Sequence, residues 1–195
     1  YYRRYNVTTN LTLNPFRTTE IKLGIQGYLA NANYPASAQS TIFESAYFTP
    51  PTYIAPLYPD GKLGAFSGGN LNPVAQLGAT GYANQWRSQV YSNLRITQQL
   101  YKGLSITGMF SFDTYNYTSN RFTKTPNTYH ATGRDANGNL IYEQTRQGTE
   151  NLAYSLSAKG DRTIYLEAAL NYKNTFGRHD VSGMLLFNQS DEINT

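Results

Sequence analysis

The feature that most constrains this chain is a regular alternation of apolar and polar residues, clearest between Val90 and Tyr117. Because successive side chains of a β-strand point to opposite faces, this period of two predicts two long strands joined at Tyr101-Lys102-Gly103. The apolar face of this ribbon carries Val90, Leu94, Ile96, Leu100, Leu104, Ile106, Phe110 and Phe112. Each arm exceeds the roughly five or six residues of a usual strand, and about ten tilted residues suffice to cross a bilayer.

The same pattern recurs along the chain and predicts an all-β fold of antiparallel up-and-down hairpins. We expect six strands, at about 4–14, 20–30, 84–100, 104–117, 160–173 and 179–189. The first turn is placed at 14–17, because Pro15 does not suit a central strand, and the last at 174–178. Long loops, at about 31–83 and 118–151, separate the three hairpins.

The two long loops are expected to carry function, because structureless segments of this length are otherwise rare in compact domains. Their many aromatic residues argue against simple disorder. Within the second loop, 129–142 is predicted to form a small hairpin that turns at Asn137-Gly138, a pair suited to the positive φ angles of a type I′ turn. No stretch of the chain is predicted to be helical.

Composition excludes several classes of function. The 195 residues include no cysteine, which excludes disulfide scaffolds, cysteine-zinc sites and thiol nucleophiles. The net charge of +4 is dispersed, so nucleic acid is not an expected partner. Mean hydropathy is −0.53, and no apolar run predicts a membrane-spanning helix. A transmembrane barrel is also polar on average, because every second residue faces inward. Without a signal peptide, the chain is expected to be a piece of a longer one.

Charge is segregated between the two faces of the predicted strands. The apolar faces carry none, and the polar faces carry Arg4, Glu20, Lys22, Arg87, Arg95, Asp113, Glu167, Lys173 and Asp180. A membrane barrel requires this segregation, but a soluble β-sandwich shows it too. The order of connections, short, long, short, long, short, favours an outer-membrane barrel, in which short periplasmic turns alternate with long extracellular loops.

Four passages resemble the SusC/RagA family of TonB-dependent outer-membrane transporters. The opening 5–10, Tyr-Asn-Val-Thr-Thr-Asn, is similar to an early barrel strand of that family. The first long loop, with Asp60-Gly61 and then 72–75, Asn-Pro-Val-Ala, is the most specific likeness. The turns at 100–104 and 170–181 are similar to periplasmic turns of the family.

This resemblance implies a 22-stranded transmembrane β-barrel with an N-terminal plug, in the bacterial outer membrane. It implies TonB and a SusD-like surface lipoprotein as partners, outer-membrane lipid around the wall, and uptake of an oligosaccharide or peptide nutrient without a cofactor. The chain would supply about six strands of wall and two extracellular loops. The plug, the segment that contacts TonB and the remaining barrel would lie elsewhere.

Three groups of residues are candidates for contact with a partner. Arg87 and Arg95 share a polar face and would meet a polar solute, or else be lumen charges balanced by nearby carboxylates. The loop aromatics would stack on sugar rings or pack on the lid, or else pack on one another; they are Tyr53, Tyr58 and Phe66. The candidate membrane-interface aromatics are Trp86, Tyr172 and Phe187.

No catalytic, metal or cofactor-binding residue is predicted. His130 and His179 lie far apart in sequence, and 135–139 begins like a calcium-binding EF-hand loop that then fails at Leu140 and Arg146. Two alternatives to the transporter stay open. One is a soluble β-sandwich that binds glycans or mediates adhesion through its loop aromatics. The other is a secreted β-rich enzyme that uses carboxylates such as Asp60 and Glu143.

Overall fold

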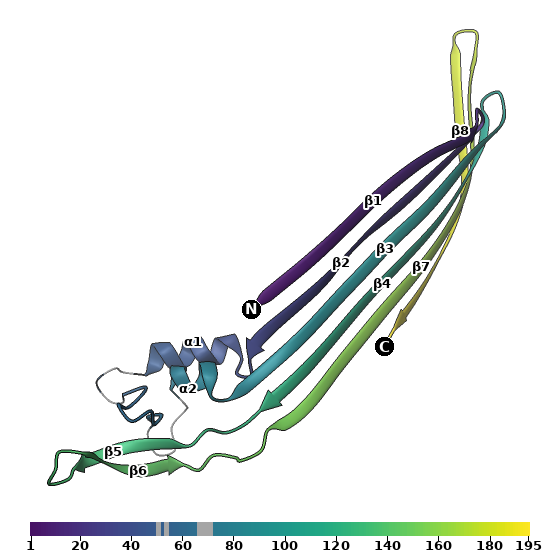
Figure 1. Ribbon diagram of the computed structural model, residues 1–195. Helices are drawn as coiled ribbons and strands as arrows, with labels where there is room; N and C mark the ends of the chain where they lie inside the picture. Colours follow the sequence, from purple (N-terminus) through teal and green to yellow (C-terminus); the bar gives the residue numbers. More distant parts are fainter. Residues whose placement is uncertain (50–51, 53–54, 66–71) are drawn as a thin grey trace. The chain divides into compact units, whose positions relative to one another are not determined.

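The computed structural model of the chain describes residues 1–49, 52, 55–65 and 72–195, and most of them form antiparallel β-structure. Six strands make one sheet in the order β1-β2-β3-β4-β7-β8, so neighbours in the sheet follow one another along the chain (Figure 1). The strands are β1 Tyr2–Phe16, β2 Thr19–Pro35, β3 Gly81–Tyr101, β4 Leu104–Thr123, β7 Ala153–Phe176 and β8 His179–Asn194. The predicted all-β class is confirmed; a closed barrel is not part of the described structure.

The chain divides into two compact units. The first, which we call the sheet unit, comprises 2–31, 86–118 and 158–195. The second, which we call the loop unit, comprises residue 1, 32–85 and 119–157, and so contains most of both predicted loops.

In the sheet unit the strands extend beyond their predicted ends. β1 continues through Pro15 to Phe16, so the turn expected at 14–17 lies instead at Arg17-Thr18. Proline is tolerated there because Pro15 lies beside the turn, one residue before the end of β1, which is an outer strand of the described sheet. The other two turns also have two residues, Lys102-Gly103 and Gly177-Arg178, and both glycines have positive φ.

The two faces of the sheet unit differ in exposure in an unusual way. Its buried residues all occupy alternate positions that the pattern assigns to the polar face: Gly24, Ala30, Thr107, Ser111 and Ala169. Apolar-face side chains such as Ile106, Phe110 and Leu185 are exposed. In a sheet folded against a water-soluble core, the apolar face is the covered one. Here the polar face is the better covered; at Gly24, for example, a Cβ would lie 3.0 Å from the Asn93 side chain and 3.3 Å from that of Asn10.

Three charged residues take positions of the apolar face, two of them beyond the predicted strand bounds and one, Arg162, within the predicted strand 160–173. The expectation that the apolar faces carry no charge is therefore wrong at Arg162. Arg162 and Asp191 take the apolar register in β7 and β8, and Arg3 takes it at the start of β1. The pairing of β7 with β8 places Arg162 opposite Ile193 and Asp191 opposite Ile164, so these charges lie at one level of the hairpin. From Ile164 to the turn, no charged residue of β7 lies on the apolar face. The charge-free part of this face therefore ends at the level of Arg162 and Asp191 in this hairpin.

The loop unit contains two helices, so the expectation of no helix is wrong. α1 spans Gln39–Phe48 and α2 spans Pro73–Gly78. α2 has a recognisable start, with Asn72 as N-cap and proline at the first position, but its six residues are too few to show a helical period. α1 has no side-chain cap, and only Ser45 is buried, so its sequence lacks an apolar stripe.

The two predicted loops fold together as a single unit. Gly64 forms a parallel bridge with Tyr129, and the Ala65 N–H donates to the Tyr129 carbonyl at 2.9 Å. Tyr129 lies in β5, Thr128–Arg134, which pairs with β6, Leu140–Arg146. A segment of the first loop thus adds to the hairpin of the second, although more than sixty residues of sequence separate Gly64 from Tyr129.

The small hairpin predicted over 129–142 is present, but its turn is not of the expected type. Gly138 has positive φ and Asn137 does not, so the pair does not form a type I′ turn. Instead Gly138 N–H donates to the Asp135 carbonyl at 3.0 Å, and the Asp135 carboxylate accepts from the N–H groups of Asn137 and Asn139. A tight turn followed by a left-handed glycine is the second common way to close a hairpin.

Candidate functional site

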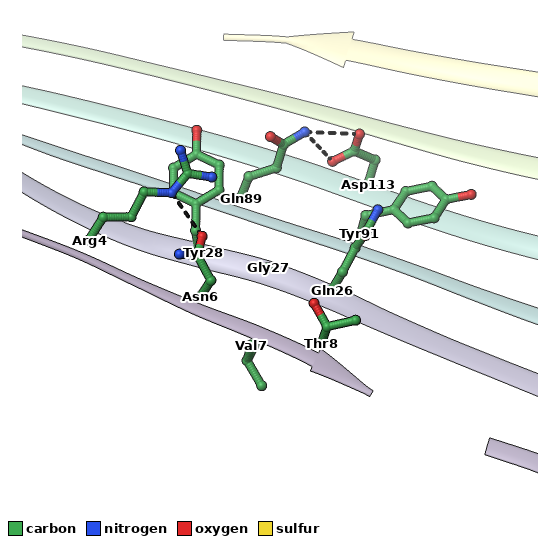
Figure 2. A pocket seen from close by; sticks show the side chains of 10 residues that line it. All are labelled: Arg4, Asn6, Val7, Thr8, Gln26, Gly27, Tyr28, Gln89, Tyr91 and Asp113. Atoms are coloured by element: carbon green, nitrogen blue, oxygen red, sulfur yellow. Dashed lines mark hydrogen bonds between the residues drawn. The ribbon is translucent and has the colours of Figure 1, made fainter. Parts of the chain in front are cut away.

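A shallow groove of about 350 Å³ lies on the polar face of the sheet unit (Figure 2). Its size falls within the roughly 300–1,000 Å³ typical of small-molecule sites. The groove crosses four neighbouring strands because polar-face positions on each strand lie at the same level. It is lined by Arg4, Asn6, Val7 and Thr8 of β1, Gln26, Gly27 and Tyr28 of β2, Gln89 and Tyr91 of β3, and Asp113 of β4.

The cation of the groove is held in place by its neighbours. The Arg4 guanidinium carbon lies 4.0 Å from the centre of the Tyr28 ring, within the range of a cation–π interaction. Arg4 Nε also donates to Asn6 Oδ1 at 2.8 Å. Figure 2 shows the guanidinium lying against the ring. The two terminal nitrogens of Arg4 form none of the hydrogen bonds found among the described residues, so they can donate to a bound solute.

The anion of the groove lies on the opposite side. Gln89 Nε2 donates to both carboxylate oxygens of Asp113, at 3.2 and 3.3 Å. Since β1 and β4 are three strand spacings apart, Arg4 and Asp113 are separated by about 14 Å across the sheet. Two residues along β4 from Asp113, the buried Ser111 Oγ has no hydrogen-bond partner among the described residues. The groove therefore offers charges of both signs, amides and phenols to a polar solute.

The groove has the chemistry of binding. It contains no histidine, and Asp113 is its single carboxylate, so it lacks the pair of titratable groups that acid–base catalysis uses. Across the described residues, no cluster of three or more His, Asp or Glu side chains is placed to hold a metal ion.

The two predicted arginines do not form one site. The Arg87 guanidinium lies 5.5 Å from the Tyr117 ring centre, and Arg95 Nη2 lies 3.1 Å from Met109 Sδ. Eight residues along β3 separate them by about 26 Å. Neither lines the groove. The residues that do line it were not predicted as a set, although Arg4 and Asp113 were both placed on polar faces.

Of the three loop aromatics predicted to contact a ligand or lid, the structure describes only Tyr58. Tyr58 is only 7% exposed; its ring packs on Tyr142 with centres 5.0 Å apart, and its hydroxyl accepts from the Ala131 N–H at 3.1 Å. This burial favours the alternative in which the aromatic packs within the loop, because a ligand would have to displace those contacts. Tyr53 and Phe66 lie outside the described residues.

The candidate interface aromatics differ in exposure. Trp86 of β3 is 46% exposed and Phe187 of β8 is 66% exposed, so both rings are available to a surrounding phase. Tyr172 of β7 is half-buried, and its hydroxyl accepts from Asn174 Nδ2 at 3.4 Å.

The carboxylates considered for an enzyme are placed in the loop unit. Asp60 forms an ion pair with Lys62, and the hydrogen bond from Lys62 holds the pKa of Asp60 below its ordinary value. The Lys62 Nζ lies 4.5 Å from the Tyr142 ring centre, and the same ion pair raises the pKa of Lys62. Glu143 lies opposite His130 in the β5–β6 hairpin. Asp60 is therefore engaged in closing a turn.

A second hollow, in the loop unit, combines aromatic rings with amides. Phe122 of β4 lies between Tyr82 of β3 and Tyr154 of β7, with ring centres 5.0 Å away on each side. The Tyr154 hydroxyl donates to Asn120 Oδ1 at 2.7 Å. The three rings and the neighbouring amides together line this hollow.

The chain matches no family model and no curated protein. In the part of the chain that the structure describes, none of the helices has the length and apolar character needed to span a membrane.

Proposed function

We propose that this chain forms part of the wall of an outer-membrane transporter of the SusC/RagA type. The observation that carries the proposal is the reversed exposure of the sheet unit, whose buried residues lie on the polar face while the apolar face is exposed. A lipid bilayer is the phase that an exposed apolar face favours. The polar face then borders the lumen, and the groove between Arg4 and Asp113 is a contact for the passing solute.

The charge pattern agrees with this orientation. An arginine or lysine that faces lipid at the bilayer centre costs about 2–4 kcal/mol, and the cost falls to about 0–1 kcal/mol near the interfaces. The charges on the apolar register, Arg3, Arg162 and Asp191, lie towards the strand ends opposite the short turns. They fit the level at which a membrane wall leaves the hydrocarbon.

The edges of the sheet require further strands. β1 and β8 are the two outer strands of the six, and an open edge cannot face lipid because its backbone groups would lack partners. In the proposed transporter, other strands close a 22-stranded barrel around an N-terminal plug. TonB would drive uptake of an oligosaccharide or peptide, and a SusD-like lipoprotein would cover the extracellular mouth.

A soluble β-sandwich is the alternative, and one observation weighs against it. A sandwich buries the apolar face of one sheet against a second sheet. The described residues form one six-stranded sheet and one small hairpin, and the apolar face of the large sheet has no covering layer among them.

The test compares neighbouring positions of β3 in the complete protein in its native membrane. Since the chain has no cysteine, Leu94→Cys and Arg95→Cys each create one site in it for a nitroxide spin label. Leu94 takes the apolar register and Arg95 the polar one. Oxygen concentrates in lipid, so we expect it to relax the spin label at position 94. A water-soluble nickel chelate should instead relax the spin label at position 95. Ile96→Cys and Thr97→Cys repeat the comparison as a matched pair.

A β-sandwich gives a different result. Its inner face is dry and close-packed, so labels at 94 and 96 would be reached by neither reagent. Equal access of the nickel chelate to all four positions would also contradict a membrane wall.

A further inference from the structure

The three short turns of the sheet unit share a composition that the transporter proposal does not use. Each strand before a turn ends in an exposed aromatic residue, Phe16, Tyr101 or Phe176. Each two-residue turn contains one basic residue, Arg17, Lys102 or Arg178. An aromatic ring beside a cation is therefore repeated in three hairpins whose turn sequences are otherwise different.

The turns lie at the same end of the sheet, and the β7–β8 turn extends beyond the other two (Figure 1). The Gln99 N–H donates to the Thr18 carbonyl at 2.7 Å, which joins the first turn to the second hairpin. The Lys173 N–H donates to the Gly103 carbonyl, also at 2.7 Å, which joins the second turn to the third hairpin. These hydrogen bonds fix the order in which the basic side chains follow one another along this end.

The turn end has an excess of positive charge. It contains five basic side chains against two carboxylates: Arg17, Lys22, Lys102, Lys173 and Arg178 against Glu20 and Asp180. Lys22 pairs with Glu20 at 2.9 Å, and Asp180 accepts a hydrogen bond from Thr175 at 2.6 Å. Among the described residues, Arg17, Lys102, Lys173 and Arg178 form no ion pair. The excess accounts for most of the net charge of +4 of the chain.

We propose that this end of the sheet binds the headgroups of anionic phospholipids in the membrane leaflet that borders the short turns. Lysine or arginine just beyond the hydrocarbon attracts anionic lipid. Aromatic side chains favour the level between hydrocarbon and headgroups, and Phe176, which takes the apolar register of β7, lies at that level, whereas Phe16 and Tyr101 take the polar register of their strands. The inference rests on the proposed membrane wall. It adds the partner at one end of that wall and the residues that select it.

The experiment measures which lipid lies next to the turns of the complete protein in vesicles. A fluorophore on Thr18→Cys reports from the first turn. The quencher is phosphatidylglycerol or phosphatidylcholine that carries a spin label on the acyl chain near the headgroup. The fluorescence falls as the concentration of the labelled lipid beside the fluorophore rises. We expect phosphatidylglycerol to quench several times more strongly, since one basic residue at the surface changes anionic-lipid binding about fivefold. Added salt should reduce the difference by screening.

Two sets of variants locate the effect. R17Q/K102Q/R178Q should remove most of the preference, whereas R17K/R178K, which keeps the charges, should retain it. K124Q/R134Q/K159Q removes the same amount of charge away from the turns and should leave the preference unchanged. Sodium phosphate in place of sodium chloride at equal ionic strength should not change the quenching, because the ligand is a lipid headgroup.

The outcomes separate this inference from the transporter proposal. Equal quenching by the two lipids, a preference that survives R17Q/K102Q/R178Q, or displacement by free phosphate overturns the inference, while the label at position 94 still reports lipid. Absence of quenching by either lipid, with the label at position 94 unreachable by oxygen, overturns the membrane wall itself.

Discussion

At the residue scale, Asn72 connects three backbone segments of the loop unit. It is only 1% exposed; its amide nitrogen donates to the Pro56 carbonyl at 3.0 Å and to the Gly64 carbonyl, and its Oδ1 accepts from the Ala75 N–H at 2.8 Å. One side chain thus caps α2 and holds the segment that pairs with β5. The 72–75 segment resembles a transporter family in its sequence, and these contacts give Asn72 a physical role in the fold.

Asn72→Ala should destabilise the loop unit by about 2–4 kcal/mol, because it leaves the Gly64 carbonyl and the Ala75 N–H without this partner and removes a helix cap. The Pro56 carbonyl keeps the Gly64 N–H as a donor, at 3.3 Å. Hydrogen exchange of the peptides covering 56–65 and 72–80 measures the effect. Asn72→Asp is the matched control, since it keeps the oxygen that caps α2 and loses the amide donors. It should loosen 56–65 more than 72–80. Equal protection of wild type and Asn72→Ala would show that Asn72 does not hold the unit together.

The Asp60–Lys62 pair gives a prediction about protonation. Because the pKa of Asp60 in the folded protein is lowered, its stabilising effect is present above the pKa of the unfolded chain and is lost as pH falls through the lower folded value. Lys62→Gln should raise the pKa of Asp60 towards its ordinary value. Carbon-13 NMR of the carboxyl group follows both titrations.

Asp135 serves as the internal control for that titration. The pKa of Asp135 is lowered chiefly by the Asn139 side chain, within a different turn. It should therefore not change in Lys62→Gln and should rise in Asn139→Ala. A shift of both carboxyl groups in Lys62→Gln would mean that the substitution disturbs the whole unit.

At the element scale, the short turns set the limits of the strands. Gly103 has φ +80°, and a Cβ there would lie 2.5 Å from the Lys173 carbonyl oxygen, whereas Gly177, with φ +64°, has open space around the same position. Glycine is needed at both turns for its backbone angle, and at Gly103 also because a neighbouring strand approaches closely. Pro15 shows the reverse case, since only the end of an outer strand tolerates it.

Gly177→Ala should cost about 1–2 kcal/mol, the price of a left-handed conformation for a residue with a Cβ. Gly103→Ala should cost clearly more, because the Lys173 carbonyl must also move and weaken its strand contact. Denaturant unfolding of the protein in detergent micelles compares the two variants. Similar midpoints would show that the Lys173 backbone yields without cost.

In the whole molecule, two parts of the sheet lack a partner among the described residues. The outer strands β1 and β8 each have one unpaired edge, and the apolar face has no covering layer. In water, unpaired strand edges and exposed apolar patches lead to association. More strands and lipid would supply these partners, which is why the transporter proposal places this chain in a larger assembly.

The 195 residues expressed alone in buffer without detergent should therefore self-associate. Sedimentation velocity would show species well above the 21.9 kDa of the monomer. Detergent micelles, by covering the apolar face, should reduce the association. A monomer with a sharp and reversible thermal transition in plain buffer would contradict the prediction and favour the β-sandwich.

The alternation of residues by itself determined the all-β class, the two faces of the sheet and the approximate positions of the turns. These properties are local, because the direction of each side chain follows from its place along one strand. Pattern alone missed α1 and α2, since one lacks an apolar stripe and the other is shorter than two helical turns.

Which distant residues become neighbours depends on how the strands pair across the sheet. The groove unites Arg4, Tyr28, Gln89 and Asp113, which are far apart in the chain and meet because strand order and register bring their polar-face positions to one level. The two loops became one unit through the Gly64–Tyr129 bridge. Pairing between distant segments depends on hydrogen bonds and packing that form only in the folded sheet, so no local pattern in the sequence encodes it.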